Sequence, residues 1–254
     1  MKYENYKICH YHIFKNAGTS LDKALQKHFG SNWSAFEGIH AHDIKSNQEL
    51  MAFLSSHPDI KAVSSHLCRP TAPLKEILPI VFLRDPLARA RSVYEFTRLD
   101  KSQPFRESAL GTFSDYLTWA LSGAPGGLVI RSYQVVHLSS ASFCPEGILF
   151  AIAAESHFEE AIQLLKSWPV IGIVEQYARS IKLIEKIYQN YFPDLTLTYE
   201  HENITSTGNN TSKIREEIGE GLFNEFNKQN KFDYQLYEFA CQRLNQLCKT
   251  NEIL

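Results

Sequence analysis

The stretch HIFKNAGTSL, residues 12–21, joins two patterns that predict different secondary structures. The preceding residues, YKICHY, are rich in aromatic and β-branched side chains, which favour a strand. After the stretch begins a helical pattern, in which Leu21, Leu25 and Phe29 recur at spacings of four residues. We therefore expect a strand, a tight loop and a helix here, with one lysine, Lys15, in the loop.

Apolar runs and helical patterns alternate along the rest of the chain. Runs typical of buried parallel strands cover residues 8–14, 60–64, 79–83, 170–174 and 195–199. Helical spacing of apolar side chains covers residues 21–29, 48–54, 87–96, 113–121, 158–165, 177–191, 212–227 and 234–247. This alternation predicts an α/β fold of three layers, with a central parallel sheet of about five strands and helices on both faces.

Composition limits the class of protein. The 254 residues are 44% hydrophobic, which is enough for one sizeable core, and we expect a single domain over residues 1–254. A net charge of −2 excludes a global field that would recruit nucleic acid or an anionic membrane. Five cysteines without CxxC spacing, and the lack of an export signal or an apolar membrane span, predict a cytoplasmic protein. A trimmed luminal domain is the alternative.

The loop after the first strand has the chemistry of an anion site. Small residues allow backbone N–H groups to approach a phosphate, the helix start favours negative charge, and Thr19 and Ser20 add hydroxyl groups beside Lys15. It is not a Walker A loop, because that motif needs the lysine after its second glycine, whereas Lys15 precedes Gly18. Ordinary helix capping by small residues is the alternative interpretation of this loop.

A second loop follows the strand expected at residues 79–83. Arg84 comes directly after the strand, Asp85 suits a helix N-cap, and Pro86 suits the first helical position. Ser92 lies two helical turns on, and its hydroxyl with the Arg84 guanidinium could bind a second phosphate. A structural ion pair of Arg84 with a carboxylate is the alternative.

Together these loops resemble two motifs of sulfotransferases. HIFKNAGTSL resembles their 5′-phosphosulfate loop, H-I-P-K-T-A-G-T-S, and VFLRDPLARARSVYEF, residues 81–96, resembles their 3′-phosphate motif, R-D-P followed by S-x-Y. The match is closest to the carbohydrate branch, including the uronyl 2-O-sulfotransferases. It extends more loosely through VIGIVEQYARSIKLIEKI, residues 170–187, to YQLYEFACQRL, residues 234–244.

The resemblance implies a P-loop-like fold and a co-substrate, 3′-phosphoadenosine 5′-phosphosulfate. Arg84 and Ser92 would hold its 3′-phosphate. Phe14 stands where the family usually has proline, and Asn16 where it usually has threonine. The residues implied for the 5′-phosphosulfate are Lys15, Asn16, Ala17, Gly18, Thr19 and Ser20.

Sulfuryl transfer to an alcohol needs a base for the hydroxyl proton and a positive group at the leaving oxygen. Lys15 suits the second task. His66, in VSSHLCRP, follows the strand expected at residues 60–64, and imidazole exchanges protons near neutral pH. The 2-O-sulfotransferases have their proposed base at the corresponding position, although Ser64 stands where they have a second histidine. The alternative is a loop histidine bonded to backbone.

No metal is expected. His10 with His12, and His40 with His42, have HxH spacing, but neither pair has a third ligand at recognisable spacing.

The acceptor is expected to be a saccharide or a small polar metabolite. A polyanionic glycan normally calls for a broad basic groove. The arginines that could contribute to one are Arg69, Arg89, Arg91 and Arg131.

Two other functions remain open. A small-molecule kinase on a P-loop scaffold would use ATP with magnesium, and a non-catalytic module would bind the nucleotide without turning it over.

Overall fold

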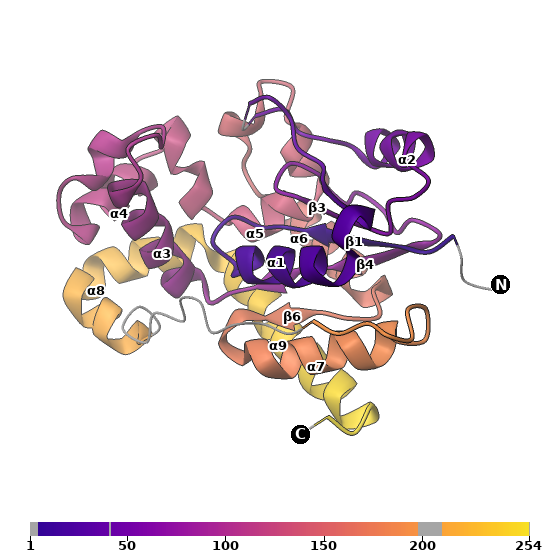
Figure 1. The fold of residues 1–254 in the computed structure, drawn as a ribbon. Helices are drawn as coiled ribbons and strands as arrows, with labels where there is room; N and C mark the ends of the chain where they lie inside the picture. Colours follow the sequence, from indigo (N-terminus) through magenta and orange to yellow (C-terminus); the bar gives the residue numbers. More distant parts are fainter. Residues whose placement is uncertain (1–4, 41, 198–209, 254) are drawn as a thin grey trace.

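The computed structural model of the chain describes residues 5–40, 42–197 and 210–253. Strands and helices alternate over its first half, and helices predominate in the second (Figure 1). The strands are β1 (Lys7–Tyr11), β2 (Trp33–Ala35), β3 (Ala62–Ser65), β4 (Ile77–Ile80), β5 (Phe82–Leu83) and β6 (Gly172–Ile173). The α-helices are α1 (Gly18–Phe29), α2 (Asn47–Ser56), α3 (Pro86–Leu99), α4 (Phe113–Leu121), α5 (Tyr133–His137), α6 (Glu155–Ser167), α7 (Tyr177–Tyr188), α8 (Thr211–Gln229) and α9 (Lys231–Thr250). Short 3-10 helices connect them, namely η1 (Gly30–Asn32), η2 (Arg106–Ala109), η3 (Pro125–Ile130), η4 (Ser140–Phe143), η5 (Ile148–Phe150) and η6 (Val174–Gln176).

The central sheet is parallel and smaller than expected. Within the described residues it has four strands in the order β2-β3-β1-β4, and Ile8 of β1 lies opposite Ala62 of β3 and Leu78 of β4. The expectation of about five strands in one sheet was wrong, because β5 and β6 pair separately as a two-stranded parallel sheet. The run expected as one strand at residues 79–83 changes its pairing partner at Val81, whose carbonyl accepts a 2.9 Å hydrogen bond from the Gly172 N–H.

Other elements also differ from the expectation. β2 was missed, because three half-exposed or exposed residues at a sheet edge give no apolar run. The short helix α5 was missed as well. Of the strand expected at residues 195–199, residues 195–197 lie in no strand and residues 198–199 lie outside the described part of the chain.

Successive residues of the strands supply opposite faces of the sheet, as the two-residue period requires. Ile8 and Leu78 face one apolar cluster, to which α1 and α7 contribute Leu25 and Ile184. Cys9 faces the other cluster, which is filled by side chains of α2, α6 and α9. The expected covering of the sheet by helices on both faces is confirmed.

A third apolar cluster joins helices that stand beside the sheet. α3, α4 and α8 pack together through residues that include Val93, Leu117 and Phe226, and they form the left-hand group in Figure 1. Among the helices of the described residues, none combines the length and the apolar composition that a bilayer crossing requires.

The topology determines where loops meet. Because the strands are parallel, the chain leaves β1, β3 and β5 at the same edge of the structure. From β1 the chain continues toward β2 and β3, whereas β4 lies on the other side of β1 and leads on through β5. Ligands of open α/β sheets bind at such a reversal point, outside the carboxyl ends of the strands.

Candidate functional site

The Lys15 loop, residues 12–17, places an open helix start beside a lysine. Lys15 and Ala17 both adopt positive φ, 65° and 58°, which turns the chain sharply into α1. Ala17 is the N-cap of α1 and offers no side-chain acceptor to the first-turn N–H groups. Thr19 is exposed and Ser20 half-buried in this turn. The turn therefore has the geometry of an anion site.

Gly18 is required by the ring of His12. A Cβ atom at position 18 would overlap this imidazole, so that only glycine fits. The close approach fixes the start of α1 against the loop.

The Arg84 loop, residues 84–86, follows β5. Asp85 caps α3 by accepting the Ala88 N–H at 2.9 Å, and Pro86 occupies the first turn, as expected. The buried Arg84 guanidinium donates from Nη1 to the Lys15 carbonyl at 3.1 Å, and its Nε lies 4.0 Å from Glu175 Oε1. The two loops expected to act together thus lie in contact.

Buried side-chain amides also join these loops. Asn16 donates from Nδ2 to the Phe82 carbonyl at 2.7 Å and to Gln134 Oε1 at 2.8 Å. Gln134 bonds the backbone of Arg84 in both directions, accepting its N–H at 2.9 Å and donating to its carbonyl at 3.0 Å. The Asn16 backbone N–H is also engaged, with Ile13 O at 3.1 Å. Asn16 therefore holds the loop together, with its polar side chain turned into the protein.

The electrostatics of the paired loops favour an anion. Burial lowers the pKa of Lys15, and the nearby Arg84 charge lowers it further, against a smaller opposite effect of Glu95. Burial also lowers the pKa of Arg84, while the carboxylates led by Glu175 oppose this effect. Two cations in a partly desolvated place repel each other, and a bound anion would relieve this repulsion.

His66 stands at the carboxyl end of β3 and is held by a carboxylate. Its Nδ1 donates to Glu37 Oε1 at 2.9 Å, and the same oxygen accepts the His66 backbone N–H at 2.8 Å. The Arg69 guanidinium fixes the His66 carbonyl from the other side, at 2.6 Å. The imidazole is 46% exposed, and none of the hydrogen bonds among the described residues uses its Nε2. Glu37 thus fixes the tautomer in which Nε2 is the basic nitrogen.

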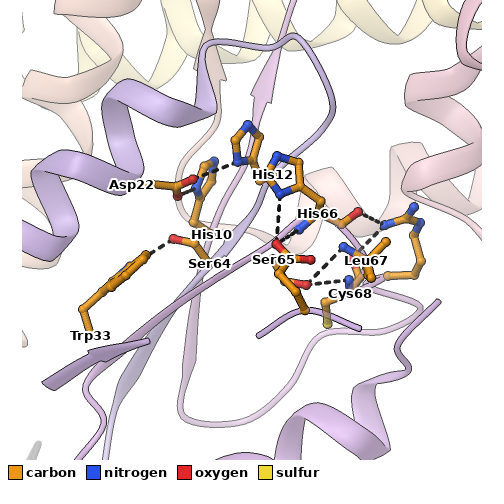
Figure 2. Close-up of polar contacts among 11 residues, drawn as sticks. His10, His12, Asp22, Trp33, Ser64, Ser65, His66, Leu67 and Cys68 are labelled. Atoms are coloured by element: carbon orange, nitrogen blue, oxygen red, sulfur yellow. Dashed lines mark hydrogen bonds and ion pairs between the residues drawn. The ribbon is translucent and has the colours of Figure 1, made fainter. Parts of the chain in front are cut away.

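Asp22 joins two further histidines, His10 and His12, beside His66. It accepts the Nδ1 hydrogens of His10 at 2.6 Å and of His12 at 2.9 Å, and the His12 ring lies 3.7 Å from that of His66 (Figure 2). The sequence has no third ligand at recognisable spacing for His10 and His12, but α1 brings Asp22 between them in space. Their donor atoms lie within 4.8 Å of one another, and such a set could hold a divalent metal. In the structure, hydrogen bonds already engage all three.

Burial determines the charge of this group. It lowers the pKa of His12 to about 4, although the hydrogen bond to Asp22 opposes the shift. The two imidazoles hold the pKa of Asp22 well below its usual range, despite the opposite effect of burial. His12 is therefore neutral at pH 7. His12 donates from Nδ1 to Asp22, and its ring packs against Gly18, so that it holds the start of α1 in place.

Ser92, expected to bind the 3′-phosphate with Arg84, lies outside this network of contacts. Ser92 is half-buried on α3, and in the described part of the chain no hydrogen bond joins it to Arg84. It lies on the helix that begins just after the Arg84 loop, and within the described residues no hydrogen bond joins its hydroxyl to Lys15 either.

The arginines considered for a basic groove are engaged with protein groups. Arg89 is buried and bonds the carbonyls of Phe14 and Val129. Arg91 pairs with Glu217, and Arg131 bonds the carbonyls of Ala120 and Ala124. The buried Arg69 bonds the His66 carbonyl, so three of these arginines bond backbone, the fourth pairs with a carboxylate, and they do not gather into a basic groove.

Sequence reasoning missed Asp22, Glu37 and Gln134. The carboxyl end of an edge strand would have indicated Glu37, but β2 has no signal of its own. Asp22 lies one helical turn beyond Gly18, and facing histidines at residues 10 and 12 are its only signal. Gln134 contacts a residue 118 positions away, and nothing local marks it.

Comparisons with known proteins give one relative and no activity. No protein-family model matches the chain. A protein of Archaeoglobus fulgidus, whose printed name is "Uncharacterized protein", is 26% identical over 253 residues, which cover 91% of this chain and 94% of that protein. The function is therefore argued from the site.

Proposed function

We propose that the protein is a sulfotransferase that moves a sulfuryl group from 3′-phosphoadenosine 5′-phosphosulfate to a hydroxyl acceptor, on a P-loop-like fold. The observation that supports this most directly is the contact between the two phosphate-binding motifs, with Arg84 Nη1 3.1 Å from the Lys15 carbonyl. One doubly phosphorylated adenosine would then meet both motifs at the reversal point of the sheet. The five unpaired cysteines agree with a cytoplasmic location.

Each residue has a task in the proposed reaction. Lys15 and the N–H groups of Ala17, Gly18, Thr19 and Ser20 hold the 5′-phosphosulfate, and Lys15 neutralises the leaving oxygen as it gains charge. Asn16, whose side-chain amide and backbone N–H bond protein groups, holds this loop in place instead of contacting the ligand. Arg84, with Ser92, holds the 3′-phosphate. His66 takes the acceptor proton on Nε2, and Glu37 orients the imidazole and stabilises its charged form.

Calorimetry with 3′-phosphoadenosine 5′-phosphate tests the donor site. We expect the wild type to bind it more tightly than AMP, which lacks the 3′-phosphate. Lys15→Ala and Arg84→Lys should each weaken binding about tenfold or more, because the first removes a cation and the second removes the forked guanidinium that can donate two hydrogen bonds to one phosphate. Lys27→Ala is the matched control, since Lys27 is exposed on the same helix α1. Equal affinity for the two nucleotides would overturn the donor assignment.

Turnover separates the proposal from the two other functions. With labelled donor, His66→Ala should lose nearly all transfer and keep nucleotide affinity. A kinase would instead turn over ATP with magnesium and show no preference for the 3′-phosphate. A non-catalytic module would bind the nucleotide, but transfer would be undetectable in both the wild type and His66→Ala.

A further inference from the structure

A cavity of about 670 Å³ opens beside His66, and its walls include six aromatic side chains. The loop after β2 and residues from α3, α4 and η3 line it. Its volume lies within the range of small-molecule sites. Its aromatic lining residues are Phe14, Phe96, Phe105, Tyr116, Trp119 and Tyr133.

The cavity contains one group that the proposed reaction needs, and the other group contacts its wall. His66 lines it directly. The Lys15 ammonium lies 4.3 Å from the centre of the Phe96 ring, and that ring is part of the wall. A molecule in the cavity would therefore lie beside the proposed base, with Lys15 near it across the Phe96 ring.

Phe14, which belongs to the Lys15 loop, also lines the cavity. It stands where sulfotransferase loops of this type have proline, and its ring packs edge to face on Phe96 with centroids 5.5 Å apart. The departure from the usual motif thus adds an aromatic surface next to the reacting centre.

The charges in the cavity disfavour an anionic acceptor. Among the described lining residues, Arg69 is the one lysine or arginine, and it is 2% exposed. Its Nε bonds Ser142 Oγ at 3.1 Å, and its Nη1 bonds the His66 carbonyl. Glu37 adds a negative charge at the His66 end. A uronate or a sulfated sugar would lose its hydration here, and the described lining residues offer it no exposed lysine or arginine side chain.

We propose that this cavity, here called the aromatic cavity, binds the acceptor, and that the acceptor is an uncharged aromatic alcohol such as a phenol rather than a saccharide. This inference rests on the proposed sulfotransferase function. In the step, the phenolic oxygen forms a bond to sulfur, the bond from sulfur to the phosphate oxygen breaks with its electron pair on that oxygen, and the phenolic proton passes to His66 Nε2. Flat rings match the aromatic walls, and one hydroxyl needs one polar partner.

Binding without donor tests the cavity separately from the reaction. We expect calorimetry to show binding of 2-naphthol to the wild type and none of methyl glucuronide. Trp119→Ala and Phe105→Ala should each weaken 2-naphthol about tenfold, because each removes an apolar wall. Phe143→Ala is the matched control, an aromatic truncation of a partly exposed residue outside the lining. Circular dichroism would verify that the variants are folded.

Transfer with labelled donor completes the test. Sulfated naphthol as product, with a higher KM in Phe105→Ala and unchanged nucleotide affinity, would support the proposal. Transfer to methyl glucuronide but not to 2-naphthol would overturn the acceptor class and leave the sulfotransferase function standing. A wild type that binds 2-naphthol, with weaker binding in the two cavity variants, but does not bind 3′-phosphoadenosine 5′-phosphate would instead overturn the sulfotransferase function. Equal naphthol affinity in the wild type and both cavity variants would show that the aromatic cavity is not the site.

Discussion

At the scale of single residues, the buried His12 makes the stability of the protein depend on pH. It is 4% exposed, its Nδ1 is bonded to Asp22, and burial lowers its pKa to about 4. In the unfolded chain it would titrate near the ordinary value of 6.5. The unfolded state therefore binds more protons than the folded state between these two values, and stability rises with pH across this interval.

We expect the free energy of unfolding to fall by about 3 kcal/mol between pH 7 and pH 4 because of His12 alone. Urea unfolding at a series of pH values would measure this. His12→Asn should reduce the slope, since an amide has no proton to gain in this range and can still donate to Asp22. The buried His137, whose pKa burial also lowers, keeps its own share of the slope in this variant.

The exposed His42 supplies the comparison, because His42→Asn should leave the slope unchanged. Identical slopes in the wild type and His12→Asn would show that His12 is not neutral in the folded protein.

At the scale of elements, α8 contains a kink that depends on one glycine. Gly219 has φ 76° and ψ 158°, a conformation that essentially only glycine adopts, whereas Gly221 two residues later has no such angle. α8 packs on α3 and α4, so the kink fits this helix to the group beside the sheet. Helix propensity alone predicts that alanine would be better than glycine at both positions. This expectation holds for Gly221 but not for Gly219, whose backbone angles are not helical.

Alanine should act in opposite directions at these two glycines. Gly219→Ala should lower the free energy of unfolding by about 2 kcal/mol through backbone strain. Gly221→Ala should raise it by up to about 1 kcal/mol, because a Cβ there meets no atom within 4 Å and alanine favours a helix. Thermal unfolding of both variants measures the contrast, and stabilisation by both would show that α8 is unkinked in solution.

At the scale of the whole molecule, Gln134 connects parts that are far apart in the sequence. Its side chain bonds Asn16 and the Arg84 backbone. Its backbone N–H donates to Asp233 of α9 at 3.1 Å. The loops after β1 and β5 are thereby fixed to α5 and α9. The geometry of the candidate site thus depends on the C-terminal helix as well as on the sheet.

Gln134→Leu should lower the free energy of unfolding by about 3 kcal/mol, because it leaves buried backbone groups of Arg84 unpaired. If the sulfotransferase proposal is correct, the affinity for 3′-phosphoadenosine 5′-phosphate should also fall. Chemical denaturation and calorimetry would measure both effects. Gln242→Leu, at an exposed position of α9, is the matched control. Unchanged stability of Gln134→Leu would contradict this account of the network.

Local signals made much of the architecture predictable. The apolar spacing that predicted a helix at residues 113–121 matches α4 (Phe113–Leu121), and the turn chemistry of Asp85 and Pro86 determined the start of α3. The signals failed for contacts between residues far apart in the sequence and for very short strands. Val81 ends one pairing and begins another, β2 is brief, and the contact of Glu37 with His66 spans 29 positions. Long-range packing determines such contacts, and apolar periodicity does not report them.

The overlap between the His12 ring and the space above Gly18 also restricts the evolutionary history of the loop. A lineage could gain a side chain at position 18 only after position 12 had become smaller, so the two substitutions have a fixed order. Descendants that retain an imidazole at position 12 are therefore bound to retain glycine at position 18.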